Sequence, residues 1–279
     1  MTPSATRYQP LRLVLLGLLL SLVAAAAGAP VREWTRDEIE AFLESAKVIH
    51  LRTLSEGVTN SQRATLSDGK FTHDAQIQSV DISKPSYPTA KGWELNFRDY
   101  WGYNVAAYRL SRMLNLDSVP VSVRREMDGR PAAVTWWIDD VLMTERTRFF
   151  TKVRPPDVTA WNRQMHCVRV FDQLIYNTDR NLGNLVITKD WKIWMVDHTR
   201  AFRRHAGIEN PKQLLMCERG LLEAVRRLDA LSLTRELGEY LAGPELDALL
   251  SRRDKIVEYF DRQIAERGEE TVLFEGDER

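Results

Sequence analysis

Cysteine is scarce in this sequence of 279 residues, which contains only Cys167 and Cys217. Two thiols cannot form a network of disulfides, and neither belongs to the CxxC pair that structural zinc sites commonly use. One bridge between the two is possible, but nothing in the sequence requires it. The sequence therefore excludes a small disulfide-stapled scaffold.

The sequence also lacks an excess of either charge and several motifs of known chemistry. Lys and Arg together number 39, and so do Asp and Glu, so the net charge is zero. A general nucleic-acid binder is usually basic, so the charge gives no support to that function. No GxxxxGK[ST], HExxH, GxSxG or dinucleotide-binding glycine pattern occurs. Metalloprotease, serine hydrolase and dinucleotide-dependent chemistry therefore find no support. What remains is the composition of a globular protein, 44% hydrophobic and 28% charged, long enough for one two-lobed domain.

The amino terminus has the pattern of a bacterial export signal. Arg7 and Arg12 precede a short apolar run over 13–23, and small residues follow to Ala29, with Ala25-x-Ala27 as a cleavage site. The sequence predicts a signal peptide over 1–29 or, alternatively, an uncleaved membrane anchor. We therefore expect a chain that is exported to the periplasm or beyond, or tethered by this segment.

Hydrophobic periodicity predicts an α+β chain with a β-rich first lobe and an α-rich second lobe. The first lobe over 30–140 begins with a helix at 35–48, capped by Thr35 and Glu38. An antiparallel sheet follows, with one helix inserted after its third strand. Its expected elements are strands at 48–54, 63–66, 71–80, 119–125 and 132–138, and the inserted helix at 101–115.

The second lobe is expected over 141–267, followed by a frayed acidic tail over 268–279. It begins with a polar loop at 143–158, and a long helix over 161–176 comes next. The remaining expected elements are strands at 185–188 and 192–196, and helices at 211–216, 218–228, 232–240 and 244–266.

Three polar residues between 175 and 202 stand where chemistry is expected. Asp179 begins a polar loop after the long helix, Asn184 precedes a strand, and Asp197 follows the next strand. A hairpin brings its two ends together, so Asn184 and Asp197 should be neighbours that face Asp179. An amide and a carboxylate oxygen suit magnesium on a polyphosphate, and a second carboxylate could orient an attacking hydroxyl. Arg180 either positions this loop by pairing with a carboxylate or lies on the surface.

This segment resembles the catalytic core of the atypical kinases. Asp179-x4-Asn184 has the spacing of the kinase catalytic loop, and Asp197 takes the place of the Asp in the DFG motif. The pattern of these residues is similar to the motifs of phosphatidylinositol 3- and 4-kinases, HipA-type kinases and secretory-pathway casein kinases. The resemblance implies a two-lobed protein-kinase-like fold that binds ATP with Mg²⁺ or Mn²⁺. It implies that Asp179 is catalytic, that Asn184 and Asp197 are metal ligands, and that the strand pair near Gly57 covers the phosphates.

Two positions depart from the kinase pattern. The resemblance places a Lys on the third strand and a Glu on the inserted helix, where this sequence has Gln78 and Asn104. The two charges are lost together, which is physically reasonable. A single remaining buried charge without a partner would be costly, whereas a Gln–Asn hydrogen bond is tolerated. A cation for the nucleotide could come from Arg98, Lys91 or Lys84, and Arg98 is nearest to the helix.

The resemblance therefore predicts transfer of the ATP γ-phosphate to a hydroxyl of a protein, lipid or small molecule. The alternative is a pseudokinase that keeps the fold as a binding or scaffold module, which Gln78 and Asn104 favour. A third possibility is another phosphotransfer, such as nucleotidylation. The sequence names no acceptor and no oligomeric state.

Overall fold

The computed structural model describes residues 34–54, 61–89 and 92–276. The helices and strands discussed below all lie within one compact unit, Thr35–Arg279. The expected leader, Gly57 and Lys91 lie outside the described residues. Among the helices of the described part, none combines the length and the apolar character needed to cross a bilayer.

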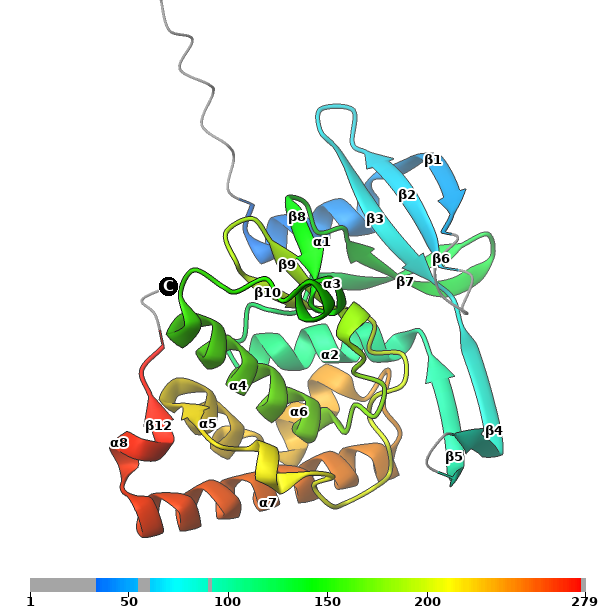
Figure 1. Cartoon of the computed structure of the whole chain (residues 1–279). Coiled ribbons are helices and arrows are strands. Elements are labelled where there is room, and N and C mark those ends of the chain that lie inside the picture. Colours follow the sequence, from blue (N-terminus) through cyan, green and yellow to red (C-terminus); the bar gives the residue numbers. More distant parts are fainter. Residues whose placement is uncertain (1–33, 55–60, 90–91, 277–279) are drawn as a thin grey trace, which may run out of the picture. The chain divides into compact units, whose positions relative to one another are not determined.

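The first lobe is built on a five-stranded antiparallel sheet in the order β1-β2-β3-β7-β6 (Figure 1). An Asp-Gly turn joins β2 to β3 as expected, with Gly69 at φ +89° and the Asp68 carboxylate accepting the N–H of Lys70. One face is apolar and buried, for example at Leu66 and Ile77. The strands are β1 (Lys47–Thr53), β2 (Gln62–Ser67), β3 (Thr72–Gln78), β6 (Ser122–Met127) and β7 (Arg130–Trp136).

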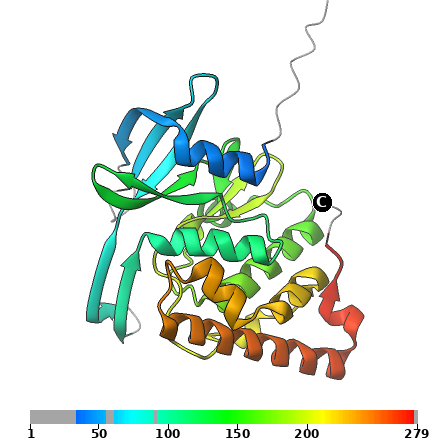
Figure 2. The same ribbon diagram turned by 180° about the vertical axis from the view of Figure 1, so that it is seen from behind.

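Helix α1 (Arg36–Ser45) contacts β6 and β7, and its Phe42 and Leu43 are buried. Figure 2 shows this helix, in blue, lying against the sheet. Thr35 and Glu38 form the expected capping box. The helix ends at Ser45 instead of residue 48, because Lys47 already pairs with Ser67 in β1. Arg125 of β6 donates hydrogen bonds to the carbonyls of Leu43 and Ala46, which the helix itself leaves without partners.

A long hairpin between the third strand and the inserted helix was absent from the sequence-based prediction. It consists of β4 (Asp81–Thr89) and β5 (Gly92–Tyr100), and it extends away from the sheet beside the second lobe (Figure 1). Two prolines lie in β4, and most of the hairpin is exposed on both faces, so it lacks the alternating burial that identifies a strand. Its base leads into α2 (Gly102–Met113), the expected inserted helix, which is buried on nearly every side.

The second lobe contains a small antiparallel sheet and a set of helices. The expected polar loop over 143–158 is wrong in its first half, because β8 (Val141–Thr144) pairs with β9 and Thr144 caps α3 (Glu145–Thr151). Helix α4 (Val158–Ile175) leads to the loop that carries Asp179. The hairpin of β9 (Leu185–Thr188) and β10 (Ile193–Met195) is the one expected.

The carboxyl-terminal third is helical, as expected, with α5 (Arg219–Arg227), α6 (Ala230–Leu237) and α7 (Gly243–Arg267). At 211–216 the expected helix is only a 3₁₀ turn over Pro211–Gln213. The frayed tail is also wrong in part. Residues after Gly268 form α8 (Glu269–Val272) and β12 (Leu273–Phe274), which pairs with β11 (Cys217–Glu218). Val272 and its neighbours are buried, so apolar burial fixes this segment.

Arg252 is a fully buried cation in α7, with 0% of its surface exposed. It donates hydrogen bonds to the carbonyls of Leu174, Arg203 and His205. Burial lowers its pKa to about 10, so it remains charged at neutral pH. One guanidinium thus joins the end of α4 to the segment that follows Asp197, and both of these lead into the candidate site.

We expect Arg252→Met to lower the free energy of unfolding by about 3 kcal/mol or more, because it leaves three buried carbonyls without their donor. Urea denaturation followed by circular dichroism measures this change. Arg262→Met on the exposed side of the same helix is the control and should stay within about 0.5 kcal/mol. Equal stability of the two variants would show that these hydrogen bonds do not hold the lobe together.

Candidate active site

The loop that carries Asp179 is held by local hydrogen bonds. Helix α4 ends where Tyr176 takes a left-handed backbone conformation, with φ +50°. The side chain of Asn177 then accepts the N–H of Asp179 at 3.1 Å, and Asn184 donates its amide to the Asp179 carbonyl at 3.4 Å. The carboxylate of Asp179 stays free of the loop backbone and is 43% exposed, with Arg200 at 3.5 Å.

Arg180 is the anchor of the site and is not a surface residue. Its guanidinium pairs with both oxygens of Asp172 on α4, at 3.0 and 3.2 Å from Nε. A second arm donates to the carbonyls of Asn184 and Val196, at 3.0 and 2.7 Å. The expected pairing of Arg180 with a carboxylate is therefore present. One side chain joins the start of the loop to both ends of the β9–β10 hairpin.

Asp197 follows directly after this hairpin. The backbone N–H of Val196 donates to the Asn184 carbonyl at 3.0 Å, so Asn184 and the residue before Asp197 are adjacent, as the hairpin argument predicts. Asp197 itself has φ +56°, an uncommon conformation for a residue other than glycine. Strain of this kind concentrates at functional sites. Thr199 donates its hydroxyl to Asp197 Oδ1 at 3.0 Å.

Gln78 and Asn104 are in contact, as expected from the paired loss of charge. Asn104 Nδ2 donates to Gln78 Oε1 at 2.6 Å, and Gln78 Nε2 lies 3.5 Å from Asp197 Oδ1. Asn104 Oδ1 accepts the N–H of His198 at 2.8 Å. A chain of amides thus links the third strand, helix α2 and the segment that begins at Asp197.

Arg98 lies on β5 and is engaged within its own hairpin. Its guanidinium is 3.8 Å from Asp81 and 4.0 Å from the centre of the Tyr100 ring. It lines a small hollow with Lys84, Asn96 and Arg204. Its role toward a nucleotide stays a prediction, as do the roles assigned to Asp179, Asn184 and Asp197.

The hairpin also brings acids to the site that the sequence-based reasoning missed. Glu94 pairs with Arg203 at 2.8 Å and Arg200 at 3.6 Å, and the Phe97 ring packs against the same two guanidinium groups. Glu94 and Phe97 are three positions apart, and on a regular strand their side chains would face opposite sides. Asn96 lies between them with φ +53°, which breaks the alternation and lets both side chains reach the same two arginines. Asp99 is buried at the base of β5. Burial raises its pKa, and the negative charge of Asp197 adds to that rise.

A pocket of about 700 Å³ opens beside Asp179, between the hairpin and the second lobe. Aromatic rings and charged groups line it together. They include Tyr87, Trp93, Glu94, Tyr176, Asp179 and Arg200. Trp93 is 72% exposed, so its ring is open to a ligand in this pocket.

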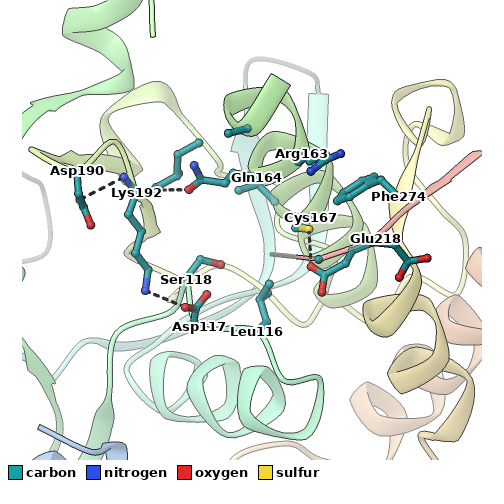
Figure 3. A pocket seen from close by; sticks show the side chains of 15 residues that line it. Leu116, Asp117, Ser118, Arg163, Gln164, Cys167, Asp190, Lys192, Glu218 and Phe274 are labelled. Carbon is teal, nitrogen blue, oxygen red and sulfur yellow. Dashed lines mark hydrogen bonds and ion pairs between the residues drawn. The ribbon is translucent and has the colours of Figure 1, made fainter. Parts of the chain in front are cut away.

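A second pocket, of about 340 Å³, lies between residues 116–118 of the first lobe and helix α4 of the second, and Figure 3 shows its lining. The ion pair of Lys192 with Asp117 and the contact of Cys167 with Glu218 belong to it. None of the predicted site residues that the structure describes lines this pocket. Cys167 and Cys217 are both free and buried thiols, so the possible bridge is not formed.

The candidate cation ligands are mixed in type. In the ranges that the structure describes, no group of three or more His, Cys, Asp or Glu side chains is arranged to hold a metal ion. The candidate set instead combines the carboxylate of Asp197 with the amide of Asn184. Such hard oxygen donors fit Mg²⁺ or Mn²⁺ bound mainly by the phosphates of a nucleotide.

The fold of the chain is similar to that of solved structures. The structure of hydra Fam20 with sugar matches with a TM-score of 0.66 and 14% identity, covering 87% of this chain and 93% of that one. The Golgi casein kinase with Mn/ADP bound matches with a TM-score of 0.60 and 13% identity, covering 88% and 80%. The chain has an atypical kinase fold. No protein-family model and no curated protein sequence matches it.

His198, which directly follows Asp197, is a buried histidine. It is 2% exposed, and burial, with help from the nearby charge of Arg180, lowers its pKa well below 6.5. Its ring meets Phe171 edge-on, at 6.1 Å between ring centres. His198 therefore stays neutral in the folded chain at pH values where it is protonated in the unfolded chain.

We expect this difference to destabilise the fold as the pH falls below about 6.5. The unfolded state then binds one more proton, so His198 alone contributes a slope of up to about 1.4 kcal/mol per pH unit. His198→Phe, which keeps a ring against Phe171, should reduce the loss of unfolding free energy between pH 7 and pH 5.5 in urea titrations. His50→Phe at an exposed position should not, and an unchanged loss in His198→Phe would refute the assignment.

Proposed function

We propose that this protein is an active atypical kinase, which transfers the γ-phosphate of ATP to a hydroxyl group. The observation that carries the proposal is the adjacency of three segments, which the β9–β10 hairpin forms and Arg180 holds. Asn184, the residue before Asp197 and the loop of Asp179 are fixed to one another by a single guanidinium. Phosphoryl transfer depends mainly on positioning and on electrostatic stabilisation, which such an arrangement supplies.

In this proposal each residue has a distinct task. Asp197 and Asn184 would hold the divalent cation, which neutralises charge on the β- and γ-phosphates. Asp179 would accept the proton of the attacking hydroxyl, and Arg200, 3.5 Å from its carboxylate, would orient it. Gln78, 3.5 Å from Asp197, would contact the phosphates as an amide donor in place of a cation. Mn/ADP in the Golgi casein kinase, which shares the fold, is consistent with this cofactor choice.

The pocket beside Asp179 favours a sugar as the acceptor. Its volume of about 700 Å³ falls in the range of small-molecule sites. Aromatic rings such as Trp93 can pack against the apolar face of a pyranose, while Glu94 and Arg200 can bond its hydroxyls. The hydra Fam20 structure, which shares the fold, is described with sugar.

Export of the chain stays a prediction. An exported kinase would need a source of ATP outside the cytoplasm.

The pseudokinase is the second candidate, and a specific contact favours it. The hydrogen bond between Gln78 and Asn104 replaces a charged pair, so the site lacks the cation that a Lys would supply to the phosphates. Under this alternative the fold would bind a partner, and substitutions at Asp179 would change nothing that can be measured with ATP.

Two substitutions separate these functions. Asp197→Asn should abolish the thermal stabilisation of the chain by ATP with Mn²⁺, because it removes the charged ligand. Asp179→Asn should keep that stabilisation and lower the rate of phosphate transfer by about 10²–10⁴-fold, the usual contribution of a general base. Asp190→Asn, in the turn at the far end of the β9–β10 hairpin, is the control for both measurements. A wild-type chain that ATP and Mn²⁺ fail to stabilise would exclude the kinase and leave the pseudokinase.

The acceptor is tested with labelled ATP and a panel of mono- and disaccharides, with casein as the protein acceptor. Once a labelled sugar is found, Trp93→Ala should raise its KM about tenfold and leave kcat nearly unchanged, since the ring binds without taking part in the reaction. Phe150→Ala is a matched control, because Phe150 is also 72% exposed but does not line this pocket. Labelling of casein alone would reject the sugar as acceptor.

A further inference from the structure

Asp99 is a buried acid with an oxygen that no donor reaches. Its residue is 7% exposed, and in the described part of the chain Oδ1 is buried without a hydrogen-bond partner. A buried carboxylate oxygen without a donor is costly, because it has lost its water and has no protein hydrogen bond in its place. Such a group calls for an explanation, such as a missing ligand.

The base of the hairpin fixes Asp99 next to the segment of Asp197. The N–H of Tyr100, the next residue, donates to the Thr199 carbonyl at 2.9 Å, two residues after Asp197. The Thr199 hydroxyl interacts with both carboxylates, and it donates to Asp197 Oδ1 at 3.0 Å. A hydroxyl has one proton to give, so it cannot satisfy the two acids at once.

The two nearby guanidinium groups are committed to other acids. Arg203 pairs with Glu94 and donates to the Arg98 carbonyl, and Arg200 pairs with Glu94 and Asp179. Neither donates a hydrogen bond to Asp99 in the chain as described. The negative charges of Asp99 and Asp197 therefore act on each other, and the charges of Arg200 and Arg203 offset them without a hydrogen bond to Asp99. Two neighbouring carboxylates of this kind favour a divalent cation between them.

Helix α2 does not supply the acid that the kinase pattern has at this place. Asn104 stands there, and its amide is fully used: Nδ2 donates to Gln78, and Oδ1 accepts the N–H of His198. We propose that Asp99, from the extra hairpin, is a further ligand of the divalent cation that Asp197 and Asn184 would hold. This inference rests on the proposed function, and it adds a strand acid to the two cation ligands proposed above.

The test is Mn²⁺ binding to the full chain in the presence of ADP, followed by the loss of the free-Mn²⁺ signal in electron paramagnetic resonance. Asp99→Asn keeps the shape of the side chain and should weaken Mn²⁺ binding at least about tenfold. The same substitution should raise the melting temperature without metal, because it removes the unsatisfied charge. Asp81→Asn removes one charge from the paired strand at an exposed position and should change neither value.

The outcomes distinguish this inference from the function beneath it. If the wild-type chain binds no Mn²⁺ with ADP, the proposed function and this inference both fall. If it binds and Asp99→Asn binds equally well, Asp99 is not a ligand and the proposed function stands. A lower melting temperature with unchanged Mn²⁺ affinity would make Asp99 a structural partner of Thr199 alone. Asp99→Ser, which can still hydrogen-bond Thr199, replaces the Asn variant if that one does not fold.

Discussion

The ion pair between Arg180 and Asp172 is the constraint on which the candidate site depends. Asp172 on α4 fixes the guanidinium, which then holds the carbonyls of Asn184 and Val196. These carbonyls lie at the two ends of a short hairpin, so the Arg180 side chain and the hairpin's own hydrogen bond between Val196 N–H and the Asn184 carbonyl together fix Asn184 relative to Asp197. A buried charge of this kind is retained only where its hydrogen bonds are complete. The relative positions of the candidate site residues thus depend on the hydrogen bonds between Arg180 and these two carbonyls.

The same fold can carry a different distribution of charge. Where the kinase pattern has a Lys and a Glu, this chain has Gln78 and Asn104, joined to each other and to His198 by hydrogen bonds. The hairpin of β4 and β5 adds acids and an aromatic wall from outside the sheet. Under the proposed function, the site would have fewer fixed cations near the phosphates of the nucleotide and more carboxylates near the divalent cation.

The sequence predicted the parts of the fold that have regular burial. The capping box of α1, the Asp-Gly turn and the β9–β10 hairpin follow from local patterns, and the Gln78–Asn104 contact follows from the cost of an unpaired charge. The hairpin over 81–100 could not be predicted in this way, because its strands are mostly exposed and β4 contains two prolines. Asp99 and Glu94 were missed with it. A weak signal existed in the alternation of Trp93, Leu95 and Phe97 before the helix.

The most direct test is a crystal structure of the chain with ADP and Mn²⁺, using the anomalous scattering of manganese to locate the ion. The account predicts an anomalous peak about 2.0–2.3 Å from oxygens of Asp197 and Asn184, with the nucleotide phosphates on its other side. A peak placed away from both side chains, or ADP bound with no manganese at this hairpin, would contradict it.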